Sequence, residues 1–184
     1  MYATSTGDDS VALFPLSPPY PSVLRLDRAW IDDMLALQAQ AADGQLITRS
    51  RADLESLFDA GHTALGMINE NGELIAQAAI RFNVNLPGIL QRQFHKASYG
   101  GEGQALIGFV MSHPDYRGRG LMADIIADCL DECRSKGQSD AHARVRYGSE
   151  GSLKNFLRQD FIILAMGPSP EDQTKLVSFV HRPL

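Results

Sequence analysis

One segment of the 184-residue chain constrains its fold more than any other. An apolar run from Ala105 to Met111 passes into a turn with the sequence Arg117-Gly118-Arg119-Gly120, and a long amphipathic stretch follows. In that stretch the apolar residues recur at helical spacing and form one continuous face: Leu121, Met122, Ile125, Ile126, Cys129, Leu130 and Cys133. The segment therefore predicts a buried strand, a glycine-rich turn and a helix over 120–136.

The turn before this helix has the chemistry of an anion site. A helix N-terminus leaves about four N–H groups unpaired and carries a partial positive charge. Gly118 and Gly120 remove side chains that would keep a ligand from these donors, and Arg117 and Arg119 add charge. This combination favours a pyrophosphate. It is neither a Walker A loop, because no Lys-Ser or Lys-Thr follows the glycines, nor a Rossmann fingerprint, because the nearby 101–103 segment lacks a third glycine.

The remaining pattern predicts a mixed α/β domain around one sheet. Strands are expected at Val23–Leu26, Ala64–Ile68, Leu74–Phe82, Ala105–Met111, Ala141–Tyr147, Phe161–Met166 and Leu176–Val180. Helices are expected at Ala29–Ala42, after a cap formed by Ser50 and Asp53, at 120–136 and at 150–159. Four prolines indicate that residues 1–21 form an N-terminal tail, so the domain is expected to span 22–184.

Composition excludes several classes of protein. Hydrophobic residues make up 44% and charged residues 21% of the chain, which is typical of a globular domain. No apolar run approaches the roughly 18 residues of a membrane-spanning helix, so no membrane association is predicted. No export signal is visible and there are only two cysteines, which predicts a cytoplasmic protein with Cys129 and Cys133 as core thiols. The histidines are too widely spaced to predict a metal site.

With these elements in this order, the chain resembles the GNAT superfamily of acetyl-CoA-dependent N-acetyltransferases from residue 22 to its end. The family motif Q/R-x-x-G-x-G/A is read at 117–122, with Met122 where glycine or alanine is usual. A second motif, N-x-x-S-x-x-x-Y-x-x-x-G-F, aligns with Ser149, Ser152, Phe156, Asp160 and Phe161 and matches at Ser152 and Phe161. The resemblance implies the acyl-CoA N-acyltransferase fold, a single mixed, mostly antiparallel sheet flanked by helices.

The resemblance also implies acetyl-CoA as the cofactor, with CoA as the product and no metal. The strand would separate from its neighbour near Tyr147, and the backbone of Val110, Met111 and Ser112 would hold the pantetheine arm. The pyrophosphate would be bound at the turn and helix start. The residues expected there are Arg117, Gly118, Arg119, Gly120, Leu121 and Met122, and Ser149 completes the expected cofactor contacts.

Acetyl transfer to an amine needs a neutral nucleophile, support for an oxyanion and protonation of the leaving thiolate. Many family members protonate the thiolate with a tyrosine on the last helix, and here Phe156 takes its place. Tyr147 is the predicted substitute acid, and Glu102, directly before the cofactor strand, is the predicted base. The alternatives are that Tyr147 only caps the sheet edge and that Glu102 is a solvated loop carboxylate.

The first hypothesis is direct acetyl transfer to an amine of a small molecule or peptide through a ternary complex, because no Cys or Ser has a recognisable nucleophile setting. The second is a catalytically weak acyl-CoA-binding or sensing domain. Nucleic-acid binding through Arg144 and Arg146 is disfavoured by the net charge of −5. The acceptor is expected to meet the first helices and the 83–103 connection, including His95 and Lys96. Strand edges near the C-terminus are compatible with a homodimer.

Overall fold

The computed structural model describes residues 22–41, 48–84, 102–169 and 174–184. The expected tail (1–21) and most of the 83–103 connection, including His95 and Lys96, lie outside the described residues. The described strands are β1 (Val23–Leu26), β2 (Thr63–Ile68), β3 (Leu74–Arg81), β4 (Gln104–Ser112), β5 (Asp140–Arg146), β6 (Ile162–Pro168) and β7 (Leu176–Pro183). The described α-helices are α1 (Ile31–Ala41), α2 (Arg51–Asp59), α4 (Leu121–Ser135) and α5 (Glu150–Leu157).

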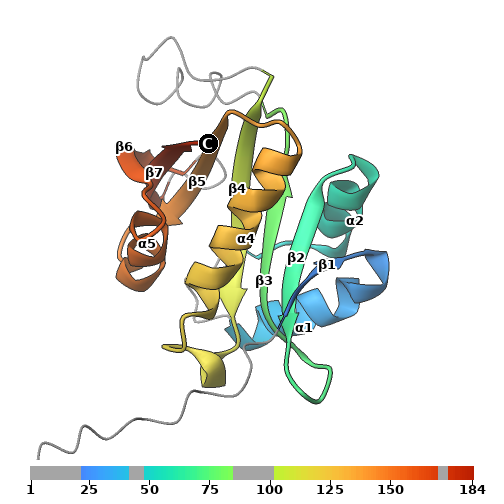
Figure 1. Ribbon diagram of the computed structural model, residues 1–184. Helices are drawn as coiled ribbons and strands as arrows, with labels where there is room; N and C mark the ends of the chain where they lie inside the picture. The colour runs from blue at the N-terminus through green and yellow to red at the C-terminus, as the bar shows by residue number, and fades with distance from the viewer. Residues whose placement is uncertain (1–21, 42–47, 85–101, 170–173) are drawn as a thin grey trace, which may run out of the picture.

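The strands form one sheet in the order β1-β2-β3-β4-β5-β7-β6. Every neighbouring pair is antiparallel except β4 and β5, which are parallel. Helices α1 and α2 cover one face of the sheet, and α4 crosses the other face with α5 near it (Figure 1). The expected mixed, mostly antiparallel sheet flanked by helices is confirmed, with element boundaries that differ from the expected ones by a few residues.

Each face of the sheet carries its own hydrophobic core. Under α4, the buried Ile125, Ile126 and Leu130 pack against alternate strand residues such as Ile80 and Ile107. On the opposite face, Met34 and Leu37 of α1 and Leu54 of α2 pack against Ala79 and Met111. Because both faces are covered, β2 and β3 are buried along almost their whole length.

The two cysteines lie in the core under α4, as predicted. Cys129 and Cys133 are free thiols and both are buried. Burial raises the pKa of the Cys133 thiol to about 12 and raises that of Cys129 as well. Both therefore stay protonated and act as small apolar side chains.

A β-bulge interrupts the pairing of β3 with β4. Gln77 pairs with Met111 and Ala79 with Gly108, so Ala78 alone on β3 faces two residues of β4. One of these two, Phe109, has a φ of 57°. A bulge of this kind bends its strand and increases the local twist.

β4 and β5 separate just before this bulge. Their pairing covers only Gln104–Ile107 against Asp140–Ala143, although β4 continues to Ser112 and β5 to Arg146. The separation implied by the resemblance is therefore present, and it begins well before Tyr147. The term "fork" below means the two strand segments 108–112 and 144–146.

A partly buried polar network joins the paired ends of β4 and β5. Gln104 Nε2 donates to Asp140 Oδ2 at 2.8 Å, and Gln104 Oε1 lies 2.6 Å from His142 Nε2. His181 Nε2 lies 2.7 Å from Asp140 Oδ1, and its ring centroid is 4.8 Å from that of His142. Burial lowers the pKa of His142 to about 4, so this imidazole is neutral near pH 7.

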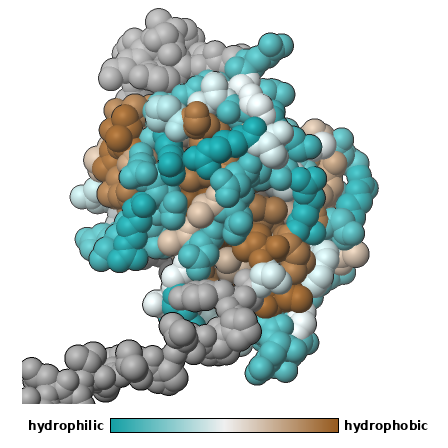
Figure 2. All heavy atoms as spheres, viewed as in Figure 1, coloured by the Kyte–Doolittle hydropathy of each residue, from teal (hydrophilic) through white to brown (hydrophobic). Residues whose placement is uncertain are grey.

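Apolar side chains are exposed at the β6 end of the sheet. Ile162, Ile163 and Met166 of β6 and Leu176 of β7 are 45% to 56% exposed. Figure 2 shows apolar residues gathered over this end of the molecule. Within the described ranges, no helix is long and apolar enough to cross a membrane.

Candidate functional site

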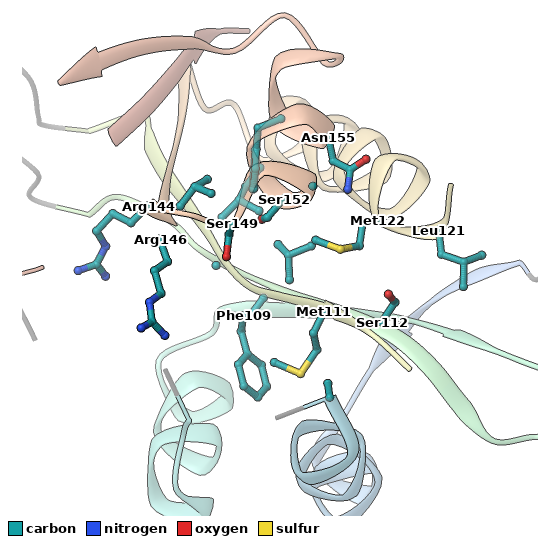
Figure 3. Close-up of a pocket in the computed structure, with 18 of the residues that line it drawn as sticks. Phe109, Met111, Ser112, Leu121, Met122, Arg144, Arg146, Ser149, Ser152 and Asn155 are labelled. Atoms are coloured by element: carbon teal, nitrogen blue, oxygen red, sulfur yellow. The ribbon is translucent and has the colours of Figure 1, made fainter. Parts of the chain in front are cut away.

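The fork opens into a cavity of about 750 Å³. Its lining comes from both arms of the fork, from β3, and from the turn that precedes α4. Helices α2 and α5 and the last residue of α1 contribute the other described walls. Figure 3 shows Phe109 and Met111 extending from β4 toward the α1 and α2 side, while Ser152 and Asn155 come from α5. The cavity therefore passes through the sheet where β4 and β5 no longer pair.

One wall of the cavity is the turn that precedes α4. Gly118 and Gly120 have φ values of 78° and 89°, in the left-handed region where side chains are strained. Gly120 is the N-cap residue, so no side chain caps the helix. The first paired N–H groups of α4 belong to Ala123 and Asp124, and both donate to the Gly120 carbonyl. Leu121 and Met122 therefore have no intrahelical acceptor for their N–H groups, which suits an anion.

The two arginines of the turn have different surroundings. Arg117 lines the cavity, and its Nη2 donates to the Ala41 carbonyl at 3.2 Å, which ties the turn to the end of α1. Arg119 is not among the lining residues. Its guanidinium lies 4.9 Å from the centre of the Tyr116 ring, a cation–π contact. Of the two arginines of the turn, only Arg117 therefore lines the cavity.

The structure brings together nine of the ten residues expected to contact the cofactor. The lining contains Val110, Met111, Ser112, Arg117, Gly118, Gly120, Leu121, Met122 and Ser149. These residues come from the β4 arm of the fork, the turn, the start of α4 and the start of α5. Arg119 alone is missing from this set.

Phe156 lines the cavity from α5 and is only 2% exposed. Its ring packs edge-on against Phe161, with the ring centroids 5.1 Å apart. A phenyl ring has no proton to donate, so this position holds no general acid. The uncharged polar side chains on the same wall are Ser149, Ser152 and Asn155.

Neither of the two predicted proton-transfer residues lines the cavity. Glu102 lies in the turn before β4, four residues before Leu106, the first β4 residue in the lining. Tyr147 follows β5 between the lining residues Arg146 and Gly148, but its own side chain is 60% exposed. Their catalytic roles stay predictions.

The cavity is basic although the chain carries a net charge of −5. Among the described lining residues, seven basic side chains accompany two carboxylates, Asp53 and Glu150. The basic residues are Arg49, Arg81, Arg117, Arg144, Arg146, Lys154 and Arg158. From the sequence alone, Arg144 and Arg146 bear only on nucleic-acid binding, which the net charge disfavours. The alternation Arg144-Val145-Arg146 was the available signal, because it puts both arginines on one face of a half-buried strand.

A family comparison identifies the class of protein to which this fold belongs. The model of the acetyltransferase (GNAT) family matches residues 28–161. The chain therefore belongs to the GNAT acetyltransferase family. No curated protein sequence matches the chain.

Solved structures of several acetyltransferases have the same fold. The ribosomal-protein-S18-alanine N-acetyltransferase from Escherichia coli has a TM-score of 0.66 and 14% identity, over 88% of this chain and 92% of that one. A GNAT superfamily phosphinothricin acetyltransferase from Sinorhizobium meliloti, in complex with acetyl-CoA, has a TM-score of 0.70 and 13% identity, over 90% and 89%. At these low sequence identities, the similarity shows only that the folds are alike.

Proposed function

We propose that the chain is an acetyl-CoA-dependent N-acetyltransferase that transfers the acetyl group directly to an amine through a ternary complex. The observation that carries this proposal is the meeting of the β4–β5 fork and the glycine turn of α4 in one cavity. The fork supplies unpaired strand backbone, and the turn supplies N–H donors for phosphate.

The open approach to the turn and its donor chemistry support acetyl-CoA as the cofactor. A Cβ at Gly118 would meet no atom within 4 Å, and one at Gly120 would meet only Asp124 Oδ2, at 3.9 Å, so the approach to the N–H groups is open. These groups and Arg117 would hold the pyrophosphate, and the β4 backbone at Val110–Ser112 would hold the pantetheine arm. Bound acetyl-CoA would supply an activated acetyl thioester to the amine.

The positions of the cysteines support direct transfer. Cys129 and Cys133 are buried under α4 and are not among the residues that line the cavity. Their raised pKa values keep them protonated near pH 7, and a thiol is a much weaker nucleophile than a thiolate. A thiol-bound acetyl intermediate on either residue is therefore disfavoured.

The absence of an acid at Phe156 is expected to slow acetyl transfer rather than to prevent it. General acids typically contribute about 10²- to 10⁴-fold, whereas a thiol with a pKa near 8.5 leaves tolerably as a thiolate. The alternative of a weak acyl-CoA-binding or sensing domain is favoured by the same residue and by Met122 at the start of α4. Amine-dependent release of CoA thiol separates the two functions.

Thermal stabilisation by acetyl-CoA, CoA and ATP tests the cofactor site. A ligand at 100 times its Kd stabilises a fold by about 2.7 kcal/mol, which raises Tm measurably. We expect a rise with acetyl-CoA and CoA and little or none with ATP. Failure of both CoA forms to raise Tm would refute the proposal. Stabilisation without thiol release for any amine would favour the binding domain.

The homodimer stays a prediction. The exposed apolar residues of β6 and β7 are the surface at which it is best tested. Light scattering of the wild-type chain and of Met166→Lys would show whether a dimer forms and depends on this surface.

A further inference from the structure

Five residues of the core on the α1 and α2 face of the sheet also line the cavity. They are Ala41 of α1, Leu54 and Leu57 of α2, Ala79 of β3 and Met111 of β4. Each is buried, with at most 6% of its surface exposed. The cavity therefore reaches from the fork into an apolar part of the fold. These five residues and Gly108, which also lines the cavity, are called the apolar compartment below.

Two small residues that face each other leave space in this compartment. Ala79 on β3 pairs with Gly108 on β4. A Cβ at Gly108 would meet no atom within 4 Å, so a larger side chain is absent where one would fit. The pairing of β4 with β5 ends at Ile107, which makes Gly108 the first residue of the open β4 arm. The space beside Gly108 and Ala79 is therefore continuous with the fork.

One buried polar side chain lies close to the compartment, and Met111 screens it. Gln77 is fully buried and pairs with Met111 across β3 and β4. Its Nε2 donates to Met111 Sδ at 3.5 Å, and Gln77 is not among the described lining residues. Ser112 does line the cavity, but Figure 3 shows it directed away from Met111, as the alternation of a strand requires. The described surface of the compartment is therefore apolar.

The charged lining residues from β3, β5 and the start of α2 are less buried than the compartment. Asp53 is exposed, and Arg49, Arg81, Arg144 and Arg146 are half-buried. Asp53 also accepts hydrogen bonds from Ser50 N and Ser50 Oγ, both at 2.8 Å, within the cap of α2. These charged groups therefore lie nearer to solvent than the buried floor of the compartment does.

The contacts proposed for acetyl-CoA leave this compartment to the second substrate. The residues proposed to bind the pyrophosphate lie at the start of α4, on the opposite face of the sheet from α1 and α2 (Figure 1). The segment proposed to hold the pantetheine arm, Val110–Ser112, includes Met111, whose side chain belongs to the compartment. The two substrates would therefore meet at β4.

From this arrangement we infer that the acceptor is an amine with an apolar substituent, an alkyl or aryl group that occupies the compartment while the amino group faces the fork. This inference rests on the proposed function. Each methylene that moves from water into an apolar site favours binding by roughly fourfold. A hydroxyl or ammonium group in the same place would lose its water without a hydrogen bond from the compartment, which disfavours polar acceptors.

A series of amines tests the inference. It runs from ethylamine to n-pentylamine, and n-pentylamine is compared with 4-amino-1-butanol and 1,4-diaminobutane, which have the same number of non-hydrogen atoms. Amine-dependent thiol release gives kcat/KM, and Tm is measured with each amine in the presence of CoA. We expect kcat/KM to rise about fourfold per methylene. It should be at least about tenfold higher for n-pentylamine than for its two polar counterparts, with the same order in the rise of Tm.

Variants of Ala79 connect the preference to the compartment. Ala79→Val fills the space opposite Gly108, so n-pentylamine should lose more than ethylamine does. Ala79→Ser adds a hydroxyl with little change in volume and should narrow the preference for n-pentylamine over 4-amino-1-butanol. Both variants should keep their Kd for acetyl-CoA, and their Tm without ligand shows that they are folded. Ala52→Ser is the matched control, because Ala52 is exposed on α2 and is not among the described lining residues.

The outcomes separate the inference from the proposed function. If acetyl-CoA raises Tm but neither kcat/KM nor the amine-dependent rise in Tm increases with chain length, the apolar acceptor is wrong and the cofactor site stands. A preference for either polar counterpart would also overturn it, as would a chain-length dependence that both Ala79 variants leave unchanged. Where no amine is turned over, the order of the Tm values decides. Failure of acetyl-CoA itself to raise Tm would instead refute the proposed function.

Discussion

Ile107 on β4 and Ala143 on β5 form the last paired register between these two parallel strands. Immediately after this pair comes the bulge of β4, where Phe109 adopts a positive φ. The bulge turns the continuing strand, so the N–H and C=O groups of its outer part have no β5 partner. A backbone irregularity therefore creates the opening in which cofactor and acceptor are proposed to meet.

Gly120→Glu is expected to abolish acetyl-CoA binding. It places a carboxylate beside the N–H groups proposed to hold the pyrophosphate, and like charges repel. Binding is measured by calorimetry and by the ligand-induced rise in Tm.

Gly137→Glu is the control for this change. Gly137 has a φ of 68° and open space around its Cβ position, so it imposes similar backbone strain and the same charge at the far end of α4. The control should lose stability but keep its affinity for acetyl-CoA. Equal affinity in the two variants would contradict the pyrophosphate assignment.

Phe156→Tyr is expected to raise kcat. It adds a phenolic proton donor at the position on α5 that lines the cavity, where the present ring can donate none. Turnover is followed by thiol release over a range of pH. Phe161→Tyr is the matched control, because Phe161 is the other ring of the edge-on pair and is not among the lining residues. No gain with Phe156→Tyr would show that the leaving thiolate needs no acid from this position.

Substitutions at Gly108 are expected to exclude the acceptor in proportion to their size. The φ of Gly108 lies outside the left-handed region and its Cβ position is open, so alanine and valine fit without backbone strain. Gly108→Ala and Gly108→Val should raise KM for the amine progressively, while the Kd for acetyl-CoA changes less. An unchanged amine KM in the valine variant would place the acceptor elsewhere.

Stability is expected to fall as the pH is lowered from about 6.5 toward 4. Burial lowers the pKa of His142 from its usual 6.5 to about 4, so in this window the unfolded chain binds a proton that the folded chain excludes. The loss attributable to His142 has an upper bound of about 3 kcal/mol. It is measured as the free energy of unfolding in urea at several pH values.

His142→Gln should flatten this pH dependence, because glutamine can donate to Gln104 but does not titrate. Asp140 contributes to the pH dependence of stability at lower pH than His142 does. Burial alone would raise its pKa, but hydrogen bonds from His181, Ser139 and Gln104 outweigh burial and lower it. Its contribution is therefore lost only as the pH falls below about 4, outside the window assigned to His142.

The sequence by itself determined the local features of this protein. The order of strands and helices, the buried thiols of α4 and the glycine turn all follow from residue periodicity and from the conformations that glycine permits. These signals depend on neighbours within a few positions, so they can be read without knowing the fold. Nine of the ten expected cofactor contacts lie in segments of this kind and line the cavity.

Only the tertiary structure decided what depends on strand pairing. The bulge at Phe109, and the end of β4–β5 pairing at Ile107 and Ala143, are properties of register between distant segments. The same pairing puts Glu102 next to the end of β4 that pairs with β5. Glu102 therefore lies outside the cavity lining, although it is close to β4 in sequence. It also gathers arginines from α2's loop, β3 and β5 around one space, because a sheet brings together residues that are far apart along the chain.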